Sequence, residues 1–432
     1  MQIVLAILAL SFLIIIHEFG HFAAAKIAGI KVLEFSLFMG PKLLSKKWGE
    51  TEYSIRMVPI GGFVRMEGEE EASDDSRAYN KQPLYTRATV AIAGPFMNIF
   101  TAVIIFSIVF SIVGFRTTQV NILGEGMAAE KAGLQIGDQV VSFGGKRVYH
   151  PMDIELFMFV NKEKPSEIEY KRGSEIRTTT IIPERILAQK RYILGFVAKE
   201  NEGTESNVVG NIVPDSNAGA AGLLQGDRIV ALNGTPVSSK GEIGEFMEHN
   251  GGESVKVTVH RDGQGSVELT IEPTLSETPE YFNIGMDYAT IKGGLFEVIK
   301  ASLVYTYSTV RSVFYSIIWL ITGTVSFKQM MGPVGIVTTI GDVVEQSPSI
   351  TLLILSLLNI TGFISINLGV MNLMPFPALD GSKLLLIGVE GIRKKAIPPE
   401  REALISLVGF VVLIMFMIFT TYNDIVRRFG GG

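Results

Sequence analysis

The sequence predicts an α+β membrane protein built from several domains, and three observations lead to that prediction. Four apolar segments are each long enough to cross the hydrocarbon core of a bilayer. A block at 32–64 is apolar but has the composition of strands. A ten-residue motif occurs twice between the second and third apolar segments. We therefore expect a four-helix transmembrane core, a membrane-reentrant β-sheet and two small extracytoplasmic domains.

The overall composition supports a membrane protein that carries a water-soluble part. Of the 432 residues, 47% are hydrophobic and 19% are charged, and the mean hydropathy is +0.34. The net charge of −5 with no broad basic surface gives no indication of nucleic-acid binding. Because the chain has no cysteine, disulfides and thiolate metal sites are excluded, and any metal must be held by His, Asp or Glu.

The four apolar segments are 2–25, 88–114, 350–373 and 403–422. The first lacks a basic leading region and a small-residue cleavage site, so we expect it to be retained as a membrane helix. Ten Lys and Arg residues lie between the first and second segments, and five lie between the third and fourth. The positive-inside rule therefore places these two loops in the cytoplasm, and both termini and the long section 115–349 outside it. Arg427 and Arg428 oppose this orientation but are outnumbered.

The block between the first two spans has two strand-like pieces, 32–39 and 52–64, rich in β-branched and aromatic residues and bounded by Gly and Pro. They are too short to span as helices and too apolar for an ordinary cytoplasmic loop. We interpret them as a β-hairpin sheet that dips into the membrane. Since strand edges do not face lipid, such a sheet must be buried or paired, and an extended substrate would be a suitable partner.

The section 115–290 contains an internal repeat. AGLQIGDQVV at 132–141 recurs as AGLLQGDRIV at 221–230, 89 residues later. Two copies at this distance indicate two small domains of one kind. The pattern resembles tandem PDZ domains of the bacterial protease type, which bind a chain end by adding a strand to a sheet edge. The sequence leaves open whether such domains bind peptide here or act only as size filters and packing modules.

Segment 295–321 is apolar but contains Lys300 and Arg311 together with several tyrosines and serines. It could be a fifth span or an amphipathic helix lying on the outer leaflet, anchored by its tyrosines and Trp319. A fifth span would put Asp380 and the HEFGH motif at 17–21 at opposite ends of their helices. We therefore favour the interfacial helix.

The first apolar segment contains the motif His17-Glu18-Phe19-Gly20-His21. Two histidines four residues apart share one face of a helix, where their imidazoles can hold one zinc ion while Glu18 acts on a water. Ionisable groups at membrane depth are costly without partners, which favours a bound metal over a chance match at the wet end of a span. The other three histidines lie in the polar middle section.

A catalytic zinc needs a third protein ligand, and Asp380 is the best candidate. It lies in NLMPFPALDG at 372–381, where Pro375 and Pro377 must end the third span. His17 lies about 24 Å along the first span at 1.5 Å per residue, in the half where the third span also ends. The two motifs are therefore expected at one depth. The alternative is that Asp380 only caps a helix at the membrane interface.

HEFGH in the first span, NLMPFPALDG after the third and the tandem repeat between them resemble the site-2 protease family of intramembrane zinc metalloproteases (M50), in its RseP-like branch with tandem PDZ domains. GPFMN at 94–98 and GPVGI at 332–336 extend the resemblance over nearly the whole chain. One departure is Ser382, where the family often has a second glycine. The resemblance implies zinc ligands at His17, His21 and Asp380, a catalytic carboxylate at Glu18, and substrate-positioning asparagines at Asn372 and Asn367.

The resemblance further implies an enzyme of the bacterial inner (cytoplasmic) membrane that hydrolyses peptide bonds in single-span membrane proteins. Such substrates include pre-trimmed anti-sigma factors, which would give a role in sigma-factor regulation, and remnant signal peptides. A non-enzymatic PDZ scaffold is the main alternative. A metal transporter is less consistent with the sequence, because the second and fourth spans carry almost no polar residues. The substrate, its entry route and the oligomeric state are left open.

The expected domains follow in chain order. They are 1–30, the first span with HEFGH; 31–87, the cytoplasmic membrane-reentrant β region; 88–115, the second span; 116–202 and 203–276, the PDZ-like domains; 277–349, an extracytoplasmic membrane-associated helical region; 350–381, the third span with NxxPxPxxDG; 382–402, a cytoplasmic loop; and 403–432, the fourth span and tail.

Overall fold

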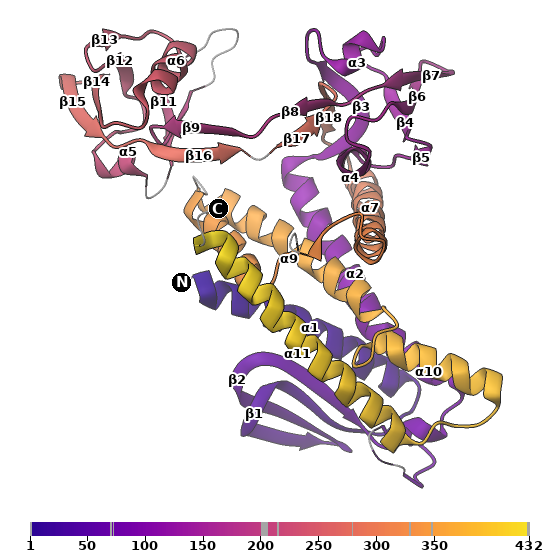
Figure 1. Ribbon diagram of the computed structural model, residues 1–432. Helices are drawn as coiled ribbons and strands as arrows, with labels where there is room; N and C mark the ends of the chain where they lie inside the picture. The colour runs from indigo at the N-terminus through magenta and orange to yellow at the C-terminus, as the bar shows by residue number, and fades with distance from the viewer. Residues whose placement is uncertain are drawn as a thin grey trace.

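The computed structural model describes residues 2–69, 71, 73–199, 206–213, 216–278, 280–327, 330–346 and 349–429. Long helices form a layer in the middle of the molecule, with a β-sheet at one end and two small lobes at the other (Figure 1). Both termini lie toward the end of the layer that carries the lobes, as an even number of spans requires.

Four helices in the described part of the chain are long and apolar enough to cross a membrane, in agreement with the prediction. The second of them, α2 (Leu84–Val113), lies at the centre and packs against α1 (Gln2–Ile27), α7 (Leu295–Ile321) and α9 (Ile350–Asn372). Small residues allow this close packing: a Cβ added at Gly20 would lie 2.3 Å from the carbonyl oxygen of Ala93, and one at Gly369 would lie 2.8 Å from that of Pro95. The four helices are α1 (Gln2–Ile27), α2 (Leu84–Val113), α9 (Ile350–Asn372) and α11 (Pro399–Phe429).

The sheet between α1 and α2 has two long strands, β1 (Val32–Trp48) and β2 (Thr51–Met66), each folded back on itself. Phe35 is paired with Val64 on one side and with Tyr53 on the other, while Tyr53 is also paired with Lys46. The sheet therefore has four arms, in the order 62–66, 32–37, 51–56 and 42–48. The predicted hairpin is present, and the arm at 42–48, which lies outside both predicted strands, forms an additional edge of the sheet.

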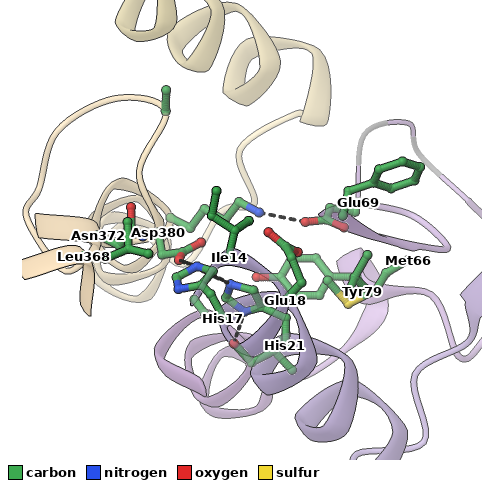
Figure 2. Close-up of a pocket in the computed structure, with 16 residues that line it drawn as sticks. Ile14, His17, Glu18, His21, Met66, Glu69, Tyr79, Leu368, Asn372 and Asp380 are labelled. Atoms are coloured by element: carbon green, nitrogen blue, oxygen red, sulfur yellow. Dashed lines mark hydrogen bonds and ion pairs between the residues drawn. The ribbon is translucent and has the colours of Figure 1, made fainter. Parts of the chain in front are cut away.

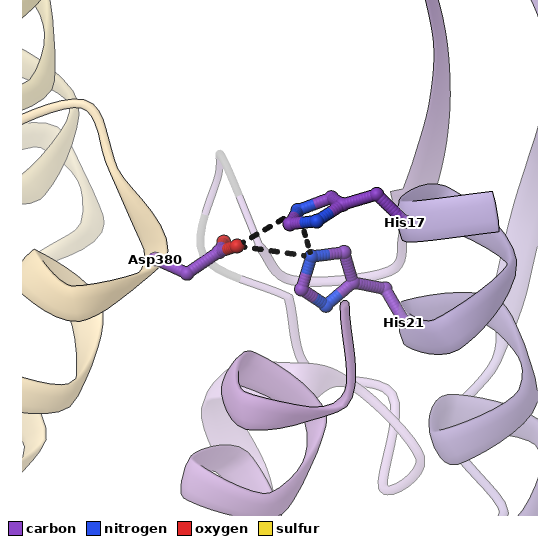
Figure 3. A group of neighbouring side chains, drawn as sticks. All are labelled: His17, His21 and Asp380. Carbon is purple, nitrogen blue, oxygen red and sulfur yellow. Dashed lines mark hydrogen bonds and ion pairs between the residues drawn. The ribbon is translucent and has the colours of Figure 1, made fainter. Parts of the chain in front are cut away.

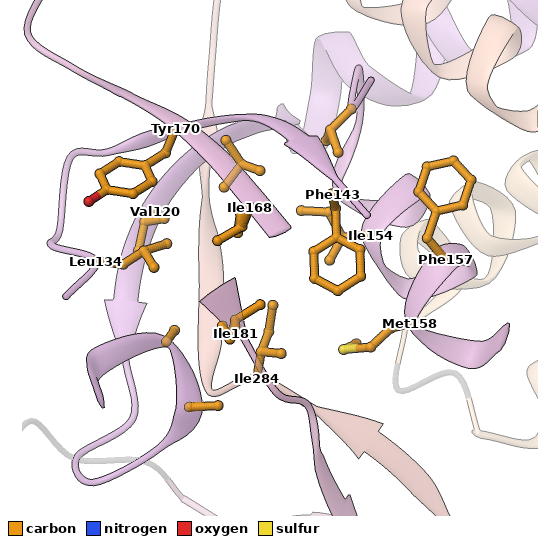
Figure 4. Close-up of a cluster of buried hydrophobic side chains, with 14 of the residues drawn as sticks. Val120, Leu134, Phe143, Ile154, Phe157, Met158, Ile168, Tyr170, Ile181 and Ile284 are labelled. Carbon is orange, nitrogen blue, oxygen red and sulfur yellow. The ribbon is translucent and has the colours of Figure 1, made fainter. Parts of the chain in front are cut away.

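The first lobe is a sheet of order β18-β3-β4-β6-β7, with the short β5 beside β4 and helix α4 against it. Its core contains Phe143, Ile154, Phe157 and Ile168 (Figure 4). The elements are β3 (Phe115–Leu123), α3 (Ala128–Lys131), β4 (Gln139–Phe143), β5 (Lys146–Arg147), α4 (Pro151–Asn161), β6 (Ser166–Arg172), β7 (Glu175–Ile181) and β18 (Met286–Ile291).

The second lobe repeats this plan with a sheet of order β13-β12-β14-β15 and one longer helix, α6, beside it. A separate pair, β10 with β11, closes its core. The elements are β10 (Phe196–Ala198), β11 (Val209–Ile212), α5 (Asn217–Ala220), β12 (Arg228–Leu232), β13 (Thr235–Pro236), α6 (Lys240–Asn250), β14 (Val255–Arg261) and β15 (Gly265–Ile271).

The second lobe is inserted into the first. The chain leaves the first lobe through β8 (Glu184–Ile186) and β9 (Gln189–Ile193) and returns antiparallel through β16 (Thr274–Thr278) and β17 (Tyr281–Asn283). The strand that follows, β18, then completes the first sheet beside β3.

This nesting differs from the expected borders at 116–202, 203–276 and 277–349. Leu194 lies in the core of the second lobe, whereas Ile284 and Tyr288 lie in the core of the first. The repeated motif marks only the middle of each lobe, so it could not show from which side of the chain a closing strand would come.

Helix α7 (Leu295–Ile321) is not one of the four candidate spans among the described residues. It lies between the C-terminal half of α2 and the first lobe (Figure 1), with Tyr305 against Phe106 of α2 at 4.7 Å between ring centroids. Arg311 forms a 2.7 Å ion pair with Asp153 of α4, whose side chain is fully buried. The interfacial location expected for this helix stays a prediction.

Two further helices complete the helical layer. Helix α8 (Pro333–Gln346) contacts α1 and α11, and its N-terminal end is held by Asp424, which accepts hydrogen bonds from the backbone of Gly332 and Gly335 at 3.1 and 2.7 Å. Helix α10 (Asp380–Arg393) packs against α2, where its Glu390 forms a buried ion pair with Arg87. Between α9 and α10 lies the turn that the sequence predicted.

Candidate metal centre and its cavity

Two imidazoles and a carboxylate meet between α1 and the start of α10. Nε2 of His17 is 2.9 Å from Oδ2 of Asp380, Nε2 of His21 is 3.3 Å from the same oxygen, and the two nitrogens are 3.2 Å apart (Figure 3). His17 and His21 are buried, and the Asp380 side chain is 13% exposed. The group could hold one metal ion, since one ligand atom from each residue lies within 4.8 Å of the others.

The turn after α9 carries Asp380 to the histidines. Helix α9 ends at Asn372, the two prolines follow, and Ala378 adopts a positive φ of 76° before α10 begins at Asp380. A Cβ at Gly381 would lie 2.2 Å from the carbonyl oxygen of Met374, so the turn is tight enough to require glycine there. The expected break of the third apolar segment is thus present, and it points Asp380 back at α1.

Helix α2 orients His21 and lies close against both rings. Nδ1 of His21 is 2.8 Å from the carbonyl oxygen of Val90, so it carries the proton and leaves the Nε2 lone pair directed at the centre. Gly94 lies one turn further along α2. A Cβ there would be 2.3 Å from Nε2 of His21 and 2.8 Å from Nε2 of His17. Only a glycine allows the helix to pass so near the two nitrogens.

Asn98 of α2 contacts the other histidine. Its Nδ2 is 3.1 Å from Nδ1 of His17, and its buried Oδ1 has no hydrogen-bond partner in the described structure. With the two amide atoms of Asn98 exchanged, Oδ1 would accept a hydrogen bond from a protonated Nδ1 of His17 and would no longer lack a partner. His17 would then present an unprotonated Nε2, as a metal ligand must. The residues around the centre therefore fit a bound cation.

A cavity of about 340 Å³ opens beside the centre (Figure 2). Glu18 lines it next to the histidines, and Asn372 lines it from α9. Asn367, by contrast, is not among the lining residues; its Nδ2 donates to the carbonyl oxygen of Phe363 at 2.9 Å. The remaining lining residues are Ile14, Phe63, Val64, Met66, Glu69, Tyr79, Val90, Ala91, Leu368, Ala378 and Lys383.

Several of these residues had no role in the sequence-based prediction. Lys383 of α10 forms a 2.7 Å ion pair with Glu69, which follows the sheet, and both line the cavity. Burial raises the pKa of Tyr79 to about 12, so its hydroxyl stays protonated beside them. Asn98 also had no assigned role, although a single asparagine inside an otherwise apolar span is a recognisable signal.

Two histidines on one apolar helix, joined by a distant carboxylate from the turn after another, are typical of one class of protein: metal-dependent hydrolases whose site lies beside membrane helices. The model of peptidase family M50 matches residues 5–416. The chain belongs to this family, the site-2 proteases, and is a zinc metalloprotease. Family and enzyme class are as predicted, and they decide against a non-enzymatic scaffold and a transporter.

Relatives match the chain over nearly its whole length. The zinc metalloprotease RasP of Bacillus licheniformis is 30% identical, covering 98% of both chains. The regulator of sigma-W protease RasP of Bacillus subtilis is 27% identical, covering 96% of both. Among solved structures, the PDZ domain of HtrA3 bound to a phage-derived ligand is 20% identical over 21% of this chain and 91% of its own, with a TM-score of 0.18.

Proposed function

We propose that His17, His21 and Asp380 hold the zinc ion and that Glu18 is the catalytic carboxylate for hydrolysis of peptide bonds in single-span membrane proteins. The observation that carries this proposal is the meeting of one carboxylate with two imidazoles from a helix 363 residues away in sequence. These are three ligands of the types found in catalytic zinc sites, and the cavity beside them offers room for water and substrate.

Each side chain has a part in the reaction. Zinc held at the centre supplies the Lewis acidity that activates a water and a peptide carbonyl near neutral pH. Glu18 lines the same cavity, where its carboxylate takes the proton of the attacking water and passes it to the leaving amine. Val90 and, with its amide exchanged, Asn98 hold the two imidazoles in the tautomers that keep both Nε2 atoms directed at the centre.

The substrate is proposed to bind in an extended conformation along the arm 62–66 of the sheet. Phe63, Val64 and Met66 line the cavity, and a Cβ at Gly62 would lie 3.8 Å from Cγ of Glu18. Among the described residues this arm is paired only with 32–37, whereas the arm 51–56 is paired on both sides. Within the strand expected at 52–64, the proposed partner of the substrate is therefore the last part only, whose outer edge is free for strand addition. Asn372 would hold the substrate backbone.

The orientation and biological role follow from the same reasoning. The connections that contain the sheet and α10 are rich in Lys and Arg, which favours a cytoplasmic location for this end of the helical layer. The two PDZ-like lobes would then lie outside the cytoplasm, and the protein in the inner membrane of a bacterium. A relative is named as a regulator of a sigma factor, which supports a membrane-anchored anti-sigma factor as the substrate class, with remnant signal peptides as another. The lobes would admit substrates whose outer domain has already been removed.

The proposal is tested with the full chain in lipid nanodiscs, by metal analysis and by cleavage of a single-span model substrate with and without chelator. Wild type should contain about one zinc per chain and lose cleavage on chelation, with recovery on zinc addition. Asp380→Asn should lose more than about 100-fold in zinc affinity, since even residues behind the ligands contribute 10–100-fold. Full zinc content in Asp380→Asn, or cleavage that survives chelation, would refute the assignment.

A further inference from the structure

The arm of the sheet farthest from the active-site cavity has an unusual apolar face. In the arm 42–48, Leu44 is paired with Ile55 and Lys46 with Tyr53, so these side chains share one face of the sheet with Trp48. A second cavity of about 340 Å³ opens on this face. It is lined by Phe35, Leu37, Leu44, Ser45, Lys46, Tyr53, Ser54 and Ile55.

Aromatic rings run across this face from its edge toward α1. Trp48 and Tyr53 have ring centroids 6.4 Å apart, Tyr53 and Phe35 are also 6.4 Å apart, and Phe35 lies 5.0 Å from Phe22 of α1. At the edge the face is open: Trp48 is 81% exposed and Leu44 is 68% exposed. Such exposure of large apolar side chains in a membrane protein indicates contact with lipid.

The sheet also has a defined depth along α1. At its base, Glu50 forms ion pairs with Lys26 near the end of α1 and with Arg77. At its tip, the hydroxyl of Ser11 donates to the carbonyl oxygen of Pro59 at 2.8 Å. Ser11 and Lys26 are about 22 Å apart along a helix, most of the depth of a hydrocarbon core. Trp48 is next to the base, and Leu44 is deeper.

Lys46 carries the one positive charge at this cavity. In the part of the chain that the structure describes, no carboxylate lies within ion-pair distance of its Nζ. Of its neighbours, Lys42 forms a 2.7 Å ion pair with Glu52, and Lys47 lies on the opposite face of the arm, away from the cavity. An unpaired ammonium beside an apolar cavity, near the depth of the headgroups, complements a phosphate attached to an acyl chain.

We propose that this face is a binding site for one anionic phospholipid of the leaflet in which the base of the sheet lies. The phosphate binds Lys46 and is flanked by Trp48, and one acyl chain occupies the cavity between Leu44, Ile55 and Leu37. A substrate helix is a less suitable occupant, because the active-site cavity lies at the opposite edge of the sheet, where Phe63, Val64 and Met66 line it.

The chain offers an internal reporter, since it has only two tryptophans, Trp48 and Trp319. Trp319→Phe leaves Trp48 as the sole indole fluorophore. This protein is placed in phosphatidylcholine nanodiscs that contain a small fraction of brominated lipid, either phosphatidylglycerol or phosphatidylcholine. Brominated phosphatidylglycerol should quench Trp48 with an apparent affinity about fivefold higher, the preference expected from one lysine near the membrane surface.

Two variants locate the source of that preference. Lys46→Gln should make the two brominated lipids equivalent, whereas Lys47→Gln, on the other face of the same arm, should retain most of the preference. Equal quenching by the two lipids in the parent protein, or equal losses in both variants, would overturn the proposal. Stronger quenching by a brominated single-span peptide would assign the cavity to substrate instead and would also overturn it. Since no catalysis is measured, the result is independent of the zinc chemistry.

Discussion

Buried aspartates occur both in the two lobes and at the candidate metal centre, and their partners differ. In the second lobe, Asp227 accepts from Nε and a terminal nitrogen of Arg261 at 2.8 and 2.7 Å and from the backbone of Leu224 at 2.9 Å. Asp138 of the first lobe has the same arrangement with Arg172. Asp380 has two imidazoles in place of an arginine. The lobes neutralise their buried charge internally, while the membrane site keeps a carboxylate available for a cation.

The aspartate that ends the motif AGL-x-x-GD has the same structural role in both lobes. The aspartate binds an arginine 34 residues later, and that arginine also donates to the carbonyl oxygen of the motif's glycine, Gly133 or Gly222, at 2.8 Å. The motif therefore closes each lobe on itself. Substitutions in the lobes should therefore affect stability without changing the zinc site, and Glu18→Gln at the site should affect activity without changing stability.

The largest effect is expected from Glu18→Gln. Loss of the general base should lower cleavage of a single-span substrate by about 10²–10⁴-fold, while zinc content and thermal stability stay those of wild type. Single-turnover cleavage and metal analysis on the same preparation measure both. Glu69→Gln is the matched control, because Glu69 is a second carboxylate in the cavity but is paired with Lys383. Equal losses in the two variants would remove the special role of Glu18.

A smaller effect is expected from Asn98→Leu, which removes the amide beside His17 but keeps a similar volume. Zinc affinity should fall by about 10–100-fold. Asn98→Asp keeps an acceptor oxygen for Nδ1 of His17 and should recover much of the loss, which competition with a chelator can measure. If Asn98→Asp binds zinc no better than Asn98→Leu, Asn98 does not accept a hydrogen bond from His17.

Asp227→Asn should weaken the second lobe by about 2 kcal/mol, the usual value of a hydrogen bond to a charged group. Amide exchange in β12 and β14 of the full chain should then accelerate about 30-fold, with no change in zinc content. Asp138→Asn should act in the same way on the first lobe. Loss of zinc in either variant would show that the lobes and the site are not independent.

The pH dependence gives the smallest effect. The hydrogen bonds and charge of Arg261 lower the pKa of Asp227 in the folded lobe, and burial opposes them only in part. The unfolded chain thus binds this proton more readily, so the pair stabilises the lobe above the unfolded pKa of about 4 and loses that contribution as the pH falls through the folded value. Protection of β14 should decline in acid, and Asp227→Asn should show a flatter decline.

The sequence was most informative where the residues that form the site are close together in a short motif. HEFGH sets two imidazoles on one helical face, and the prolines after Asn372 force the turn that delivers Asp380, so the centre could be predicted without coordinates. Asn98 and Val90 were missed because their roles depend on how α2 packs against α1, which no short pattern encodes. Asn367 was placed beside the substrate by analogy, yet its amide is bonded within its own helix.

The parts of the fold that were missed depend on long-range pairing. The arm 42–48 has three lysines and lies outside both predicted strands, but its alternate side chains match those of 51–56, and pairing decides its structure. Likewise β18 is about 170 residues from β3 in sequence, so its place in the first sheet could not be inferred from the repeat.

The insertion of one lobe into the other sets an order for biogenesis. Synthesis proceeds from the N-terminus, so β3, β4, β6 and β7 emerge first, yet the strand that completes their sheet is made only after the whole second lobe. The sheet of the first lobe therefore keeps the edge of β3 unpaired until the second lobe has been synthesised. Helix α7, which packs on the first lobe and on α2, follows immediately after β18, so the contact between the lobes and the helical layer is also completed late in synthesis.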